Sequence, residues 1–114
     1  MKTKLEFERL LHTNPDLTTH GFGTDDNNKD SFDIERSNIH DCFGEYEICL
    51  QYLAAQKRLD KKATSYWLKH QVEHWARENG LIPDYIREGA FVAAVIAMNL
   101  PYKRVKNSTH ILLK

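Results

Sequence analysis

The apolar run from Ala90 to Met98 restricts the fold of this chain more than any other segment. Its nine residues carry no charge, Gly89 precedes them, and Asn99 and Pro101 follow as residues that end helices. A helix that is apolar on every side has to be buried among other elements. The run is far shorter than the roughly 18 apolar residues of a membrane helix. It therefore predicts a short central helix around which the remaining chain folds.

Other segments show apolar residues at the three- and four-residue spacing of amphipathic helices. One covers residues 38–59, with Ser37 as its expected N-cap. Another covers Ser65–Asn79 and is ended by Gly80. Residues 3–12 have the same spacing over a shorter length and predict a third, short helix.

The remaining segments differ from these in composition. Residues 13–33 collect proline, glycine and a polar run, which predicts a flexible loop. Residues 102–114 place strand-forming residues on both sides of an Asn-Ser turn, which predicts an irregular tail or a β-hairpin. We therefore expect a mainly α fold, one domain over residues 1–114, with three or four helices and a helical core spanning residues 34–114.

Charge is divided unevenly along the chain although its total is zero. The chain has 16 Lys and Arg against 16 Asp and Glu, but residues 1–48 hold five basic and eleven acidic residues. The reverse holds for residues 49–114, with eleven basic and five acidic ones. A total of zero excludes a basic field over the whole protein, but it does not exclude a local patch. Two interpretations stay open: a basic binding surface guarded by an acidic segment, or two faces that attract each other.

Basic residues of the second half form two clusters, one after the predicted helix 38–59 and one after the apolar run. The clusters comprise Lys57, Arg58, Lys61, Lys62, Lys103, Arg104 and Lys106. Together in space they would form a site for the phosphates of a nucleic acid, and solvated charge without a ligand is the alternative. A helix-turn-helix of the usual kind is excluded, because its recognition helix presents polar side chains to base edges and Ala90–Met98 has none.

The predicted helix 65–79 also carries a polar face opposite its apolar one. At 100° per residue this face holds Tyr66, His70, Glu73 and Arg77, which we expect to contact a partner. A homodimer is an alternative, with Trp67 at the edge of the apolar face as an interface residue.

A metal-dependent hydrolase is a second alternative. His70, Glu73 and His74 match the His-x-x-Glu-His pattern of inverted zinc peptidases, in which both histidines bind one metal ion. Such a site needs a third ligand, and only Glu78 and Glu88 follow as glutamates. We therefore expect no metal, no other cofactor and no catalysis.

Several other patterns indicate structure alone. Cys42 and Cys49 are seven residues apart and would lie about 10.5 Å apart on one helix, too far for a disulfide. They are expected as small core residues. The polar run 26–30 lacks the glycine and glutamate that a calcium loop requires. The first residues lack the apolar stretch of a signal peptide, so we expect a cytoplasmic protein without a membrane segment.

Two motifs together resemble a family. The segment Ser-Tyr-x-Leu-Lys-His-x-x-Glu begins at Ser65, and Gly-Ala-Phe-Val-Ala-Ala begins at Gly89, followed by Tyr102-x-Arg104. This pattern is similar to a group of small, largely uncharacterised proteins of bacterial phages, prophages and plasmids, over about residues 48–112. The chain departs from the group at Glu88, where the group usually has asparagine. The resemblance implies an accessory protein of a mobile genetic element and supplies no mechanism.

The sequence therefore predicts a small, non-enzymatic accessory or regulatory protein. Its expected partner is a nucleic acid or a protein that handles nucleic acid. The metal-dependent hydrolase and the homodimeric interaction module remain the alternatives.

Overall fold

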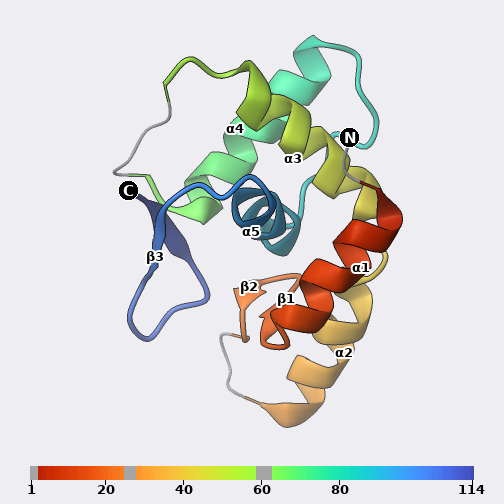
Figure 1. The fold of residues 1–114 in the computed structure, drawn as a ribbon, viewed down its shortest axis with the longest axis vertical. Coiled ribbons are helices and arrows are strands. Elements are labelled where there is room, and N and C mark those ends of the chain that lie inside the picture. The colour runs from red at the N-terminus through yellow and green to blue at the C-terminus, as the bar shows by residue number, and fades with distance from the viewer. Residues whose placement is uncertain (1–2, 25–27, 59–62) are drawn as a thin grey trace.

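A computed structural model describes residues 3–24, 28–58 and 63–114 of the chain (Figure 1). Within these residues five helices and two small antiparallel hairpins form one body. The helices are α1 (Lys4–Thr13), α2 (Lys29–Ile39), α3 (Phe43–Ala55), α4 (Ser65–Glu78) and α5 (Glu88–Ala97). The hairpins are β1 (Leu17–Thr18) with β2 (Gly21–Phe22), and β3 (Tyr102–Arg104) with β4 (Ile111–Leu113). The mainly α class is confirmed, with five helices where three or four were expected.

The central helix is confirmed as α5. Figure 1 shows it nearly end-on, with α3 and α4 on one side and the first hairpin on the other. All its residues from Glu88 to Val95 are buried. The small side chains allow close packing: a Cβ atom built on Gly89 would lie 1.8 Å from the carbonyl oxygen of Thr18. Only glycine fits where β1 crosses this helix.

The single helix predicted for residues 38–59 is wrong. The chain instead forms α2 and α3 with a break at His40–Cys42, and Ser37 lies inside α2 rather than at its start. Three successive backbone N–H groups, from His40 to Cys42, donate to carbonyls three residues earlier. This tighter winding ends the α-helical ladder. It also lets Ile39 and Cys42 both reach the core, where each is fully buried.

The flexible loop predicted for residues 13–33 is also corrected. This segment contains the hairpin β1–β2, whose Leu17, Thr18 and Phe22 are buried, and it contains the start of α2. The side-chain oxygen of Asn28 accepts the N–H groups of Asp30 and Ser31 and so caps that helix. Residues 25–27 lie outside the described residues.

The other predicted elements are confirmed. Helix α4 begins after Thr64, whose hydroxyl accepts the N–H of Trp67. The tail forms the hairpin β3–β4, with Ile111 and Leu113 buried. No helix in the described part of the chain is long and apolar enough to cross a membrane.

Candidate functional site

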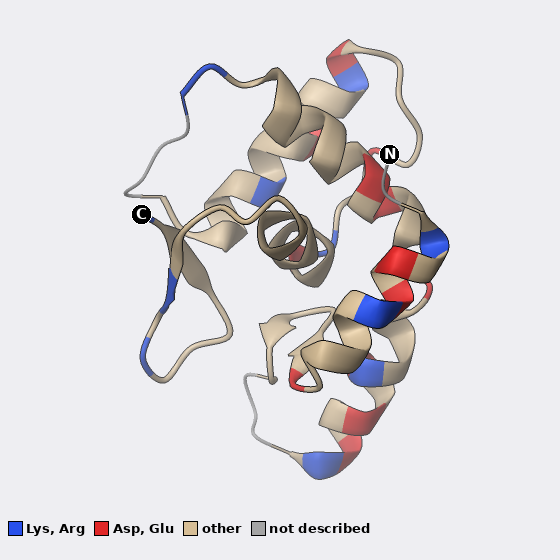
Figure 2. Ribbon diagram, viewed as in Figure 1, with Lys and Arg blue, Asp and Glu red and all other residues tan. Residues whose placement is uncertain are grey.

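The two oppositely charged halves of the chain separate in space. In Figure 2 the acidic residues of α1 and α2 lie on one side of the molecule, while the C-terminal hairpin on the opposite side carries lysine and arginine. Among the described residues two ion pairs join the halves: Arg104 Nη1 lies 2.9 Å from Asp16 Oδ2, and Arg87 Nη1 lies 3.6 Å from Glu45 Oε2. The acidic segment therefore covers little of the basic surface.

The first basic cluster lies beside the open end of the C-terminal hairpin and the second lies on the hairpin itself, and we name the surface that they form the basic edge. It comprises Lys57, Arg58, Lys103, Arg104, Lys106 and Lys114. A hollow of about 560 Å³ is lined by Lys57 and Arg58 after α3 and by Lys114 after β4. The hairpin then leads from this hollow past Lys103 to Lys106 in its turn. Lys61 and Lys62, predicted for the same site, lie outside the described residues.

Most of the basic edge has no internal partner. Lys57, Arg58, Lys103 and Lys106 are exposed and form no ion pair with any residue that the structure describes. Arg104 differs, because its guanidinium also lies 4.2 Å from the ring centre of Phe22. The edge is therefore a row of solvated cations with one arginine fixed at its inner side.

The polar face predicted on α4 is not a single exposed surface. Glu73 is only 7% exposed, and its Oε2 accepts the N–H of Ile86 at 2.8 Å while its Oε1 lies 2.8 Å from His70 Nδ1. Burial raises the pKa of Glu73, but the Ile86 and His70 hydrogen bonds and the charge of Lys69 outweigh it and hold that pKa below its usual value. Glu73 thus fastens the segment before α5 to α4, and only Tyr66, His70 and Arg77 remain for a partner.

The His-x-x-Glu-His motif receives no support from this geometry. His70 and His74 each contact a different carboxylate, Glu73 and Glu78, at 2.8 and 2.5 Å. Within residues 3–24, 28–58 and 63–114, no three ligand-type side chains are grouped to hold a metal ion. Trp67 is 56% exposed on α4, and the homodimer alternative stays a prediction.

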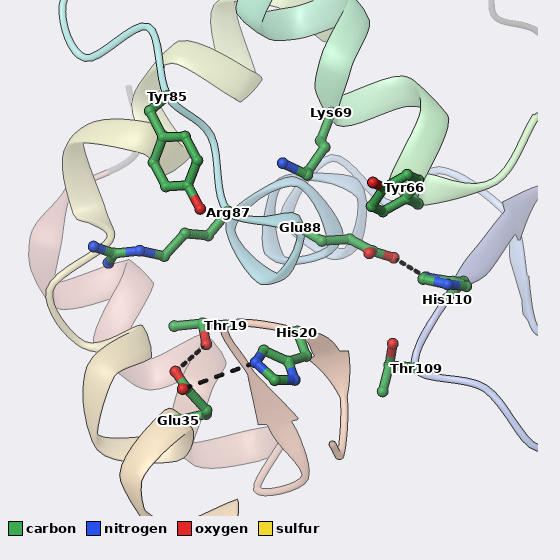
Figure 3. A pocket seen from close by; sticks show the side chains of 10 residues that line it. All are labelled: Thr19, His20, Glu35, Tyr66, Lys69, Tyr85, Arg87, Glu88, Thr109 and His110. Atoms are coloured by element: carbon green, nitrogen blue, oxygen red, sulfur yellow. Dashed lines mark hydrogen bonds and ion pairs between the residues drawn. The ribbon is translucent and has the colours of Figure 1, made fainter. Parts of the chain in front are cut away.

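A polar pocket of about 670 Å³ lies at the N-terminal end of α5, and none of the sequence motifs predicted it (Figure 3). Both hairpins, α2, α4 and the segment before α5 contribute to its wall. We name it the tyrosine pocket; it is lined by Thr19, His20, Glu35, Tyr66, Lys69, Tyr85, Arg87, Glu88, Thr109 and His110.

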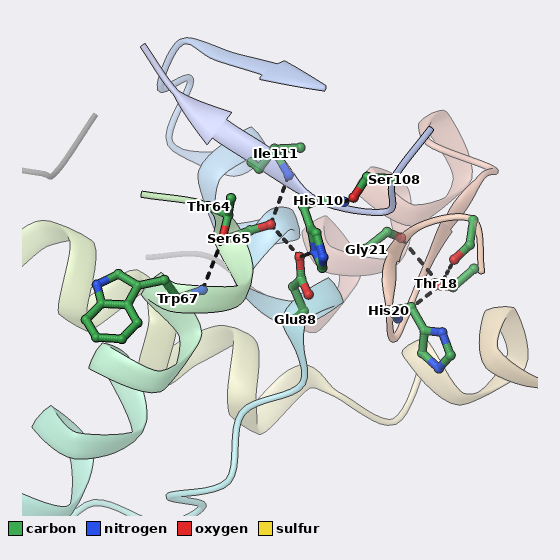
Figure 4. Close-up of polar contacts among 11 residues, drawn as sticks. Thr18, His20, Gly21, Thr64, Ser65, Trp67, Glu88, Ser108, His110 and Ile111 are labelled. Atoms are coloured by element: carbon green, nitrogen blue, oxygen red, sulfur yellow. Dashed lines mark hydrogen bonds and ion pairs between the residues drawn. The ribbon is translucent and has the colours of Figure 1, made fainter. Parts of the chain in front are cut away.

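One wall of the tyrosine pocket is a hydrogen-bonded group centred on Glu88, which is 6% exposed (Figure 4). Its Oε2 accepts the Ser65 hydroxyl and lies 2.5 Å from His110 Nδ1. The Ser65 oxygen in turn accepts the N–H of Ile111 at 2.9 Å. Glu88 Oε1 has no hydrogen-bond partner among the described residues, so it is an open acceptor in the wall.

A second carboxylate, Glu35 of α2, forms the opposite wall. Its Oε1 accepts the Thr19 hydroxyl at 2.5 Å, and its Oε2 lies 3.8 Å from His20 Nε2. The Thr19 hydrogen bond lowers the pKa of Glu35 below its usual value, so the group is ionised at neutral pH. Glu35 Oε2 makes no hydrogen bond to a described residue and is a second open acceptor.

The two permanent cations of the pocket, Lys69 and Arg87, each lie near a carboxylate that does not line the pocket. Lys69 Nζ donates to the carbonyl of Ile86 and lies 3.6 Å from Glu73. Arg87 Nη1 lies 3.6 Å from Glu45, whose pKa is raised by burial. Burial also raises the pKa of the Cys42 thiol beside Arg87 to about 11, so this cysteine carries no charge at neutral pH. With both cations paired, Glu35 and Glu88 decide the character of the pocket, and it favours hydrogen-bond donors over anions.

The sequence holds one signal for this site. Glu88 stands directly before an apolar run, and a carboxylate buried with that run requires partners. Those partners, Ser65 and His110, are 23 and 22 residues away and belong to elements whose packing the sequence pattern does not reveal.

No family model, no curated protein and no solved structure matches this chain. The resemblance to proteins of mobile genetic elements therefore stays a prediction.

Proposed function

We propose that this chain is a small accessory protein that binds nucleic acid through the basic edge. The observation that supports it most is the row of exposed lysines and arginines along the C-terminal hairpin, none of which except Arg104 pairs with a described acidic residue. Phosphate groups release counterions when such residues neutralise them, and this favours binding without any preformed cleft.

The shape of the hairpin fits the same role. Strand residues alternate in direction, so Tyr102 and Arg104 turn toward Phe22 while Lys103 points to the other face. Ile111 and Leu113 hold the inner face in the core. A fixed two-stranded ribbon with outward cations can follow a phosphate backbone, as β-ribbon proteins do.

Fluorescence anisotropy tests the proposal. Labelled single-stranded RNA, single-stranded DNA and duplex DNA are titrated with the protein at two salt concentrations. We expect binding at micromolar protein that weakens as salt rises, and at least tenfold weaker binding after Lys103→Glu with Lys106→Glu. The control reverses two charges on the acidic side, Lys4→Glu with Lys29→Glu, and leaves the affinity within threefold. Absence of binding to all three probes overturns the proposal.

A further inference from the structure

The tyrosine pocket lies next to the basic edge. A second hollow, of about 550 Å³, separates the turn of the C-terminal hairpin from β2 and is lined by Arg104 and Lys106. Thr109 lines both this hollow and the tyrosine pocket. A nucleic-acid strand whose phosphates contact Arg104 and Lys106 therefore runs past the mouth of the tyrosine pocket.

Charge decides which part of such a chain can enter. The pocket contains the carboxylates of Glu35 and Glu88. Its two cations, Lys69 and Arg87, already lie close to the carboxylates of Glu73 and Glu45. A phosphate would meet Glu35 and Glu88 without a free cation to balance it. A neutral base avoids this repulsion, and its N–H groups match the open oxygens Glu35 Oε2 and Glu88 Oε1.

Two tyrosines supply a surface for stacking. Tyr66 and Tyr85 are 52% and 62% exposed, and both rings lie within 6 Å of the Lys69 ammonium, at 5.8 and 5.3 Å. Exposed aromatic rings beside a cationic groove are the usual means of holding unpaired bases. The pocket volume of about 670 Å³ is within the range that accepts a small molecule.

We propose that the tyrosine pocket binds one unpaired base of a single-stranded nucleic acid and prefers bases with an exocyclic amino group. Adenine and cytosine donate from such a group to a carboxylate, whereas the single ring N–H of uracil lies between two carbonyl oxygens, which glutamates repel. The inference rests on the proposed function, because the basic edge is what brings the strand to the pocket.

The test compares labelled decamers of adenine, cytosine and uracil ribonucleotides in the same anisotropy assay. We expect the cytosine and adenine strands to bind at least fivefold more tightly than the uracil strand. Tyr85→Ala should remove most of this preference and weaken binding of the cytosine strand at least fivefold. Trp67→Ala is the control, since Trp67 is an aromatic residue of α4 with similar exposure but does not line the pocket.

A second variant makes the test independent of stacking. Glu35→Gln keeps an oxygen for Thr19 but can turn an amide N–H₂ toward the pocket in place of Glu35 Oε2. We expect it to lower the cytosine-to-uracil affinity ratio at least threefold. Thermal melts of each variant show whether it is folded.

The outcomes separate the two proposals. Absence of binding to every strand overturns the proposed function. Binding of all three strands with equal affinity, or a preference that Tyr85→Ala and folded Glu35→Gln leave unchanged, overturns the base pocket alone. Free AMP or CMP that binds as tightly as the decamer also overturns it, in favour of a site for a free small molecule.

Discussion

The two hairpins of this protein have similar size and opposite roles. The first, β1–β2, is buried between α2 and α5, and its backbone touches α5 so closely that Gly89 has no space for a side chain. The second, β3–β4, buries one face and leaves its lysines in solvent. A close backbone contact with α5 and buried side chains on both strands fix the first hairpin, whereas in the second the buried side chains of β4 hold one face. The exposed side of the second hairpin is therefore free to carry a binding surface.

Gly89→Ala should break the first hairpin and have the largest effect. The new methyl group would overlap the Thr18 carbonyl and disturb the hydrogen bond from Gly89 N–H to Thr19 O. We expect a loss of more than about 3 kcal/mol in the free energy of unfolding, or no stable fold. Chemical denaturation followed by circular dichroism measures it.

Gly44→Ala is the matched control for that substitution. A methyl group at Gly44 would meet Pro83 at 3.5 Å, an ordinary contact, in a helix that alanine favours. We expect unchanged stability or a gain of up to about 1 kcal/mol. An equal loss at both glycines would contradict the close crossing at Gly89.

The same difference explains which hairpin the sequence predicts. In residues 102–114 an Asn107-Ser108 turn separates Val105 from the apolar run Ile111–Leu113, so the sequence shows the pattern of a hairpin. The strands β1 and β2 have two residues each, which is too short for any alternation. Their conformation depends on a contact with Gly89, about 70 residues away along the chain. Only the small residue at position 89 hints at it.

The sequence also predicts some parts of the candidate sites and not others. The basic edge follows from residue type and exposure, and the sequence predicts it as two clusters. The prediction of an exposed partner face on α4 is wrong at Glu73. Helical periodicity places that residue on the polar side, but it cannot show that Glu73 is buried and accepts the N–H of Ile86. The tyrosine pocket depends on five separate segments of the chain, so no single local pattern reveals it.

Substitution of one arginine at each hairpin tests the difference between the two hairpins with a smaller expected effect. Arg36 donates to the backbone carbonyls of Leu11, Asn14 and Leu17, which ties α1 and β1 to α2. Arg36→Met leaves these acceptors unpaired, and we expect a loss of about 2 kcal/mol, measured by urea denaturation.

Arg104→Met is the counterpart at the second hairpin. The pair of Arg104 with Asp16 is about half exposed on both sides, so its removal should cost less than about 1 kcal/mol. If Arg104→Met destabilises the protein as much as Arg36→Met, the two hairpins do not differ in the way described.

Acid should weaken the first hairpin through Glu35. The Thr19 hydrogen bond lowers the pKa of Glu35, so its carboxylate favours the folded state at pH values above the unfolded pKa. This contribution is lost as the pH falls through the lower pKa of the folded state. We expect wild type to exceed Glu35→Gln in stability by up to about 1 kcal/mol near pH 7, and the difference to shrink as the pH falls through the lowered pKa of the folded state. Thermal melts across this range measure it, and a pH-independent difference would contradict the mechanism.

Neutralising the outer side of the second hairpin should have the smallest effect on folding and a clear one on binding. Lys103 and Lys106 are exposed and unpaired with any described residue, so Lys103→Gln with Lys106→Gln should change the free energy of unfolding by less than about 0.5 kcal/mol. If both contact phosphates of a single strand, the slope of log K against log salt should become shallower by about 1.4, since each contact contributes about 0.7. The control Lys4→Gln with Lys29→Gln should leave that slope unchanged. A double variant at the hairpin that loses stability but keeps its slope would assign these lysines to the fold, and the two hairpins would then share one role.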